Sequence, residues 1–123
     1  MMKPISVWKQ ELSGGAHAAR LAALYCCAPE QTPAQAARYE AVLDGLEATF
    51  GPHAEAGLYS APGRTEIGGN HTDHQHGRVL AGSVNIDMIA AAGPNTLGQL
   101  RVQSEGYDLC VIDLNDLAAR KEE

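Results

Sequence analysis

The chain changes character at Gly51-Pro52, and this division restricts its fold class more than any other feature. Before this point, apolar residues recur every three or four positions, which is the spacing of one helix face. After it, apolar runs are separated by glycine, proline and asparagine, which is typical of strands and turns. Helices followed by strands predict an α+β fold, with N-terminal helices packed on a mixed or antiparallel sheet.

Two helices are predicted in the first half. The longer runs from about Pro33 to Phe50, where apolar side chains recur at helical spacing. Thr32 is expected to be its N-cap, in a capping box with Gln35, and Gly51-Pro52 ends it. A shorter, alanine-rich helix is expected over 17–27, with three side chains on one side: Leu21, Leu24 and Tyr25.

Strands are predicted in the second half, over 58–61, 79–92, 100–104 and 109–114. The last two are expected to form a hairpin through the turn 105–108. Asn115 is placed to cap a further helix. Because the chain has 123 residues, we expect one domain over 1–123.

Composition excludes several classes of partner. The formal net charge is -6 at pH 7, so no basic surface for nucleic acid is expected. No apolar run is long enough to span a bilayer and the first residues do not resemble a signal peptide, so we expect a cytoplasmic protein without a membrane partner. Three cysteines without CxxC spacing predict buried, reduced thiols rather than disulfides or a zinc site.

The segment Ser60–Leu80 is the most chemically dense part of the chain, and it reads SAPGRTEIGGNHTDHQHGRVL. Its glycines are expected to bend the chain so that polar side chains converge in a loop. Arg64 follows Pro62-Gly63, so its guanidinium is expected to face an anion or a developing charge.

Two chemistries suit the polar residues of this segment. The pattern H-x-D-H-x-H, formed by His71, Asp73, His74 and His76, is a candidate divalent-metal site. Neighbouring side chains of an extended strand point to opposite faces, which argues against metal binding. Sugar recognition is the other interpretation, because a carboxylate accepts hydrogen bonds from two vicinal hydroxyls while Asn70 and His71 donate or accept. The balance favours a sugar and no metal.

The same residues resemble the signature of the galactokinases. From Ala61 the chain reads A-P-G-R-T-E-I-G-G-N-H-T-D and, from Gly77, G-R-V-L. The family signature is A-P-G-R-V-N-L-I-G-E-H-T-D-Y, followed by a glycine before V-L. The close match covers about twenty residues, and a looser one extends over nearly the whole chain. The chain thus resembles the N-terminal portion of a GHMP-family sugar kinase, which implies a ribosomal S5 domain 2-like fold.

The resemblance implies a role for each matching position. Arg64 falls on the family's catalytic arginine, which stabilises charge while the γ-phosphoryl group of ATP passes to the anomeric hydroxyl of galactose or a related hexose. Four consecutive residues fall on the segment that holds the sugar hydroxyls: Asn70, His71, Thr72 and Asp73. Glu66 replaces the family's asparagine and Asn70 its glutamate, so Glu66 is expected to take over part of the sugar contact.

The resemblance also implies parts that these residues lack. We find no match to the family's phosphate loop, P-x-G-x-G-L-S-S-S, or to its catalytic aspartate between Met1 and Glu123. ATP and Mg²⁺ are cofactors of the full-length family and are not expected to bind well here, so this chain alone is expected to be inactive. The alternative is a non-catalytic sugar-binding, sensor or interaction module. Exposed strand edges are expected to favour homo-oligomers.

Overall fold

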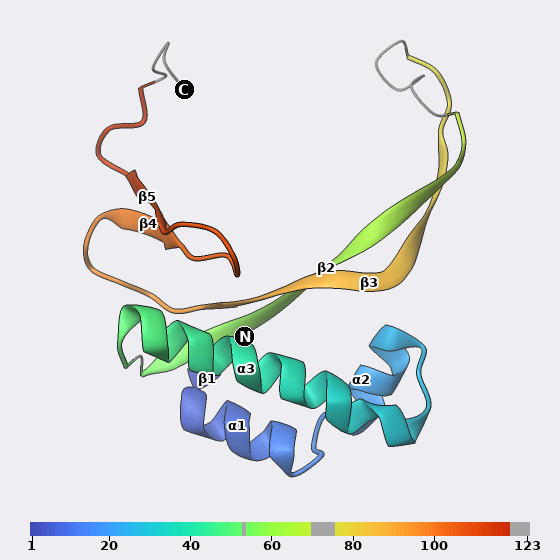
Figure 1. Cartoon of the computed structure of the whole chain (residues 1–123), viewed down its shortest axis with the longest axis horizontal. Helices are drawn as coiled ribbons and strands as arrows, with labels where there is room; N and C mark the ends of the chain where they lie inside the picture. Colours follow the sequence, from blue (N-terminus) through green and yellow to red (C-terminus); the bar gives the residue numbers. More distant parts are fainter. Residues whose placement is uncertain (53, 70–75, 119–123) are drawn as a thin grey trace.

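The computed structural model describes residues 1–52, 54–69 and 76–118. Their elements follow one another in the order β1 (Lys3–Pro4), α1 (Ile5–Ser13), α2 (Ala18–Tyr25), the 3-10 turn η1 (Pro29–Gln31), α3 (Thr32–Phe50), β2 (Glu55–Gly68), β3 (Leu80–Ala92), β4 (Gln99–Val102) and β5 (Cys110–Asp113). Helices precede strands and all strand pairs are antiparallel, so the α+β prediction is confirmed (Figure 1).

Helix α3 confirms the long predicted helix, but its start differs from the prediction. The turn η1 leads directly into α3, and the Thr32 hydroxyl donates a hydrogen bond to the Pro29 carbonyl at 2.8 Å. The Gln35 side chain accepts a hydrogen bond from Arg38 at 2.8 Å, so the predicted Thr32–Gln35 capping box does not form. At the other end, Gly51 adopts a φ of +82° and its N–H donates to the Glu47 carbonyl at 3.0 Å.

The short helix α2 is also confirmed, and α1 was not predicted. In α2, Leu21 and Tyr25 are buried, but Leu24 is half exposed and does not share their side. In α1, Trp8 is buried and its indole Nε1–H donates to the Ala56 carbonyl of β2 at 2.8 Å. This bond joins the first helix to the sheet. Among the described helices, none has the length and apolar character needed to cross a membrane.

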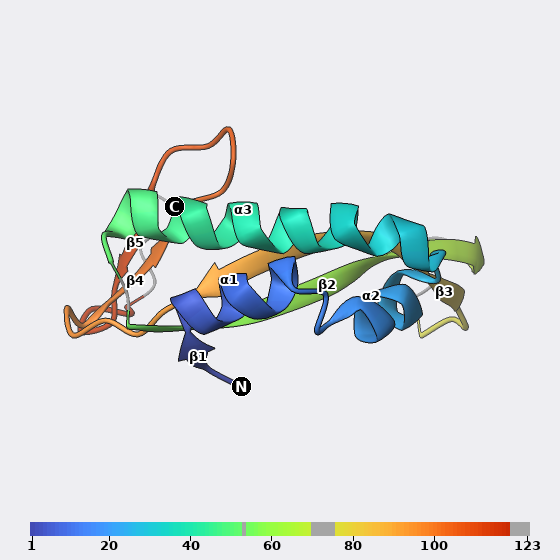
Figure 2. The ribbon, with the colours of Figure 1, turned by 90° about the horizontal axis from the view of Figure 1, so that it is seen from below.

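The core lies between the helices and one face of the sheet. It contains ten buried residues from α1, α2, α3 and the start of β2: Ile5, Trp8, Leu12, Leu21, Tyr25, Ala36, Tyr39, Leu43, Leu46 and Ala56. Leu58 of β2 and Ile89 and Ala91 of β3 pack against this core from the sheet. Helix α3 runs along the strands (Figure 2). The prediction of helices packed on a sheet is therefore confirmed.

Strands β2 and β3 form a long antiparallel hairpin, which we call the β2–β3 hairpin. The predicted strand 58–61 was too short, because β2 extends through the glycine- and proline-containing residues that follow it. Its far end projects away from the helices and bends (Figure 1). The register shifts twice, between Pro62 and Arg64 and again between Glu66 and Gly68.

The sheet face opposite the helices is uncovered among the described residues. Exposed apolar side chains on this hairpin include Tyr59 of β2 and Ile86 and Met88 of β3, with 55%, 76% and 79% of their surface accessible. Strand β3 is the last strand of its three-stranded sheet. The expected exposed apolar face and strand edge are thus present, while association of copies stays a prediction.

Strands β4 and β5 form the predicted second hairpin, a separate two-stranded sheet. The Arg101 guanidinium of β4 lies over the Phe50 ring at 5.2 Å from its centroid. Residues 116–118 are not helical, so the helix expected after Asn115 does not begin there. The cysteines are free as predicted, but Cys26 and Cys110 are exposed rather than buried.

Candidate functional site

The polar segment 60–80 is only partly a loop. Its first nine residues belong to β2, so Gly63 and Gly68 are strand residues and not loop residues, and the pairing register shifts at each of them. Pairing with the apolar strand β3 overrides the turn tendency of this glycine- and proline-containing sequence. Four predicted sugar ligands lie outside the described residues: Asn70, His71, Thr72 and Asp73.

Two predicted site residues lie on β2. Arg64 pairs with Ser83 and Glu66 with Ala81, and the two side chains lie two positions apart on the same strand. The Arg64 Nη2 donates a long hydrogen bond to Glu66 Oε1, at 3.5 Å. The Arg64 side chain is 72% exposed and that of Glu66 30%. The structure therefore brings these two predicted residues together at an accessible position.

Register irregularities flank this pair on both sides. The first lies between Pro62 and Arg64 and the second between Glu66 and Gly68. Irregularities of this kind bend a strand and redirect its side chains, and they are frequent next to binding sites. At the first one, a Cβ on Gly63 would lie 3.2 Å from the Ile86 carbonyl oxygen, so the two strands approach closely there.

Gly69 marks the point where the chain leaves β2. Its φ is +85°, a conformation that disfavours side chains. A Cβ at this position would lie only 2.2 Å from the Arg78 carbonyl oxygen, so there is no space for a side chain here. The expectation of a glycine bend is therefore confirmed at Gly69, directly before the predicted sugar ligands.

The expectation that ATP and Mg²⁺ do not bind well to this chain stays a prediction. Within 1–52, 54–69 and 76–118, no group of three or more His, Cys, Asp and Glu side chains could hold a metal ion. His76 is the one member of the H-x-D-H-x-H pattern that lies within the described residues. It is exposed and has a φ of +59°.

Sequence reasoning missed a buried polar cluster around Asp87 of β3. The Asp87 side chain is 3% exposed, and its carboxylate accepts three hydrogen bonds from three different elements. Arg38 of α3 donates at 2.7 Å, Ser60 of β2 at 2.6 Å and Tyr25 of α2 at 2.5 Å. The Tyr25 hydroxyl also bonds the Tyr39 hydroxyl at 2.7 Å.

The protonation of this cluster follows from its contacts. Burial acts to raise the pKa of Asp87, but hydrogen bonds from Ser60, Tyr25 and Arg38 outweigh it and leave the pKa below 3.8. Burial and the hydrogen bond to Asp87 raise the pKa of Tyr25. Asp87 is therefore ionised and Tyr25 neutral at pH 7. The cluster fixes the β2–β3 hairpin to α2 and α3. In the sequence, the sign of this cluster was Asp87, the single charged residue in the long apolar run 79–92.

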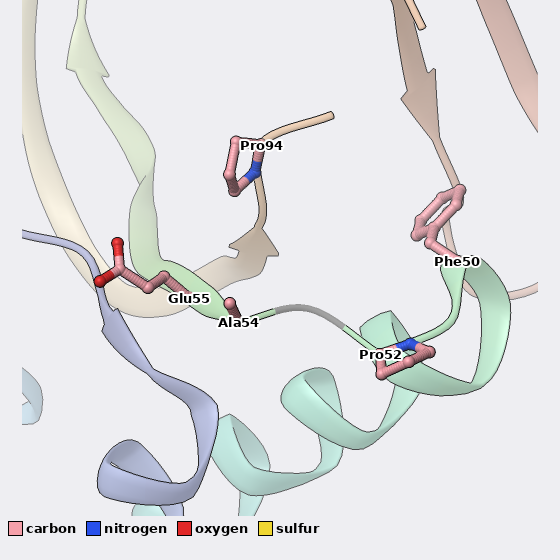
Figure 3. Close-up of a pocket in the computed structure, with 5 residues that line it drawn as sticks. All are labelled: Phe50, Pro52, Ala54, Glu55 and Pro94. Carbon is pink, nitrogen blue, oxygen red and sulfur yellow. The ribbon is translucent and has the colours of Figure 1, made fainter. Parts of the chain in front are cut away.

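A hollow lies at the opposite end of the β2–β3 hairpin. It has a volume of about 440 Å³ and is lined by Phe50, Pro52, Ala54, Glu55 and Pro94 (Figure 3). Glu55 begins β2, nine positions before Arg64, and a strand rises about 3.3 Å per residue, so the two are up to about 30 Å apart along β2. The hollow is therefore separate from the predicted site.

Comparison with known proteins identifies the segment that contains this site. Residues 46–94 match the family described as the galactokinase galactose-binding signature. No curated protein and no solved structure matches the chain significantly, so the likeness to a GHMP kinase fold stays a prediction. The matched range covers the end of α3, all of β2 and β3, and every predicted site residue. The chain therefore carries a galactokinase-like portion with a galactose-binding signature at residues 46–94.

Proposed function

We propose that this chain is the sugar-binding part of a galactokinase-type enzyme and that it binds galactose or a related hexose at the far end of the β2–β3 hairpin. The match of residues 46–94 to the galactose-binding signature carries this proposal. The proposed hydrogen-bonding partners of the sugar hydroxyls are Asn70, His71, Thr72 and Asp73. Arg64 and Glu66 precede them in the chain, on β2.

The chemistry of the described pair supports a polyol ligand. A guanidinium group offers several N–H donors and a carboxylate offers acceptors, while each sugar hydroxyl can donate and accept. Arg64 and Glu66 lie next to each other and are accessible, so both remain available to a ligand. Their weak, exposed ion pair at 3.5 Å costs little to rearrange when a sugar hydroxyl approaches.

The anchoring of the hairpin supports the same proposal. The Asp87 cluster and the Trp8–Ala56 hydrogen bond hold the base of the hairpin against the helices. Binding groups mounted on a strand that is anchored in this way lose less conformational freedom when a ligand binds. The hairpin therefore provides a defined support for the signature residues.

The phosphorylation step stays a prediction for a complete enzyme. We propose that Arg64 there stabilises the charge that develops near the anomeric hydroxyl, as the family resemblance implies. We derive no ATP-dependent step for these residues, because no match to the family's phosphate loop or catalytic aspartate is found between Met1 and Glu123. The proposal for this chain is sugar binding.

Calorimetric titration of the chain with galactose and a panel of hexoses tests the proposal. Replacing Asp73 with alanine should weaken galactose binding by more than tenfold, because losing a hydrogen-bonded carboxylate costs about 1.5–3 kcal/mol. Asp108→Ala is the matched control, since Asp108 is an exposed aspartate in the turn between β4 and β5. Equal affinities of the two variants for galactose would refute the assignment of Asp73.

A further inference from the structure

The β2–β3 hairpin contains two paired parts that differ in their contacts with the core. We call residues 57–62 and 87–92 the hairpin base, and residues 64–68 and 80–83 the hairpin arm. In the base, Leu58 and Ile89 pack against the core, and Asp87 accepts hydrogen bonds from α2 and α3. In the arm, every residue except Gly82 is exposed. The core therefore holds the base but not the arm.

The base and the arm meet at an irregular step in the pairing. On β2, Gly63 alone lies between the last pair of the base and the first pair of the arm, whereas β3 has three residues there, 84–86. Extra residues on one strand form a bulge, which interrupts the ladder of backbone hydrogen bonds and bends the strands. The hairpin does bend between its base and its far end (Figure 1). The arm is therefore joined to the base where regular pairing is interrupted.

Each strand has a feature at this step that suits a pivot. On β3, the Asn85 Nδ2 donates a long hydrogen bond to the Tyr25 carbonyl oxygen of α2, at 3.5 Å. A neutral hydrogen bond of this length is weak, so it opens at low cost. On β2, a Cβ on Gly63 would lie 3.2 Å from the Ile86 carbonyl oxygen. Glycine both permits this close approach and tolerates a wide range of backbone angles.

We propose that this bulge is a hinge about which the hairpin arm changes direction relative to the base, with the Asn85 hydrogen bond as its latch. The arm keeps its own cross-strand pairing, so it moves as one unit and presents Arg64 and Glu66 together. Opening and closing of the latch exchange two directions of the arm on the microsecond-to-millisecond timescale of collective hinge motions. The inference rests on the geometry of the hairpin and stands whether or not the chain binds a sugar.

Residual dipolar couplings of the backbone amides test the hinge in the whole ¹⁵N-labelled chain. The amides of the base and of the helices should fit one alignment tensor. The couplings of the arm should be smaller than the values that this tensor gives, because the arm averages over two directions. Relaxation dispersion should detect exchange at residues 84–86 and in the arm. One tensor that fits base and arm alike, with no exchange at the bulge, would overturn the proposal.

Asparagine variants test the latch. Asn85→Ala should reduce the couplings of the arm further, because the bond to α2 is lost. Asn95→Ala is the matched control, since it removes a similar bond from an asparagine amide to a backbone carbonyl, that of Gln99, outside the hairpin. The couplings of the arm should then stay at their wild-type values. Equal effects of the two variants would exclude Asn85 as the latch.

A deletion tests the bulge itself. Removing residues 84 and 85 leaves one residue of β3 opposite Gly63 and preserves the alternation of side chains between the two faces. The base and the arm should then share one alignment tensor, and the exchange should disappear. A deletion variant that folds and keeps the reduced couplings of the arm would show that the bulge is not the hinge. If this variant does not fold, the wild-type couplings decide the question alone.

Discussion

Replacing Asp87 with asparagine should strongly destabilise the fold, because this nearly buried carboxylate joins β3 to α2, α3 and β2. Asparagine keeps one oxygen acceptor but presents an NH₂ group where the carboxylate accepted hydrogen bonds from Tyr25 and Ser60. Hydrogen bonds to a charged group contribute about 1.5–3 kcal/mol each. Tyr25 keeps its bond to Tyr39, and Arg38 is 39% exposed and regains water. The net loss should therefore be about 2–4 kcal/mol.

This loss is a large fraction of the stability of a small domain, which is typically about 5–15 kcal/mol. Urea unfolding measures it directly, with the fluorescence of Trp8 as the probe, because Trp8 is the single tryptophan and is buried in the core. Asp108→Asn is the matched control, since Asp108 is exposed. The free energy of unfolding of this variant should stay within about 0.5 kcal/mol of the wild-type value.

The pH dependence of the same comparison gives an independent check. The pKa of Asp87 is lowered from 3.8 in the folded chain, so the ionised carboxylate stabilises the fold above pH 3.8. This contribution is lost as the pH falls through the lower folded pKa. The stability difference between wild type and Asp87→Asn should therefore shrink in acid below pH 3.8. An unchanged midpoint in urea at pH 7 would refute the role given to the cluster.

Three further substitutions test other parts of the structure. Trp8→Phe leaves a buried backbone carbonyl of β2 without its donor and should cost about 1–3 kcal/mol in urea unfolding. Gly69→Ala must strain a φ of +85° and displace a carbonyl 2.2 Å away, whereas Gly68→Ala meets nothing within 4 Å. Hydrogen exchange at the end of β2 should thus accelerate about tenfold or more in Gly69→Ala but not in Gly68→Ala. Ile86→Lys should reduce self-association in sedimentation, and Leu97→Lys, at another exposed apolar residue, should not; a wild-type monomer at all concentrations would contradict this.

Periodicity was sufficient to predict most of the secondary structure. Helix α3 and strands β3, β4 and β5 were found within one or two residues, because their apolar spacing and flanking turn residues are clear. Helix α1 was missed because nine residues give a weak pattern, and its burial depends on contacts with α3 and β2. Strand β2 was predicted too short because Pro62 and Gly63 favour turns in isolation, while pairing with β3 makes them part of a strand.

The candidate site was predictable to the extent that it depends on a local motif. The signature places Arg64 and Glu66 close together in the chain, and the structure confirms that they are in contact. The Asp87 cluster was not predictable in the same way, because its donors come from Tyr25, Arg38 and Ser60, which are far apart in sequence. Only the packing of two helices on the hairpin brings these groups to one carboxylate.

The most direct test of the central claim is an amide NMR titration of the ¹⁵N-labelled chain with galactose. If the far end of the β2–β3 hairpin binds the sugar, resonances of residues 64–73 should shift in a saturable manner. Resonances of Phe50, Ala54 and Glu55, which line the hollow at the other end, should stay in place. Shifts confined to that hollow, or no saturable shift with any hexose, would contradict the account.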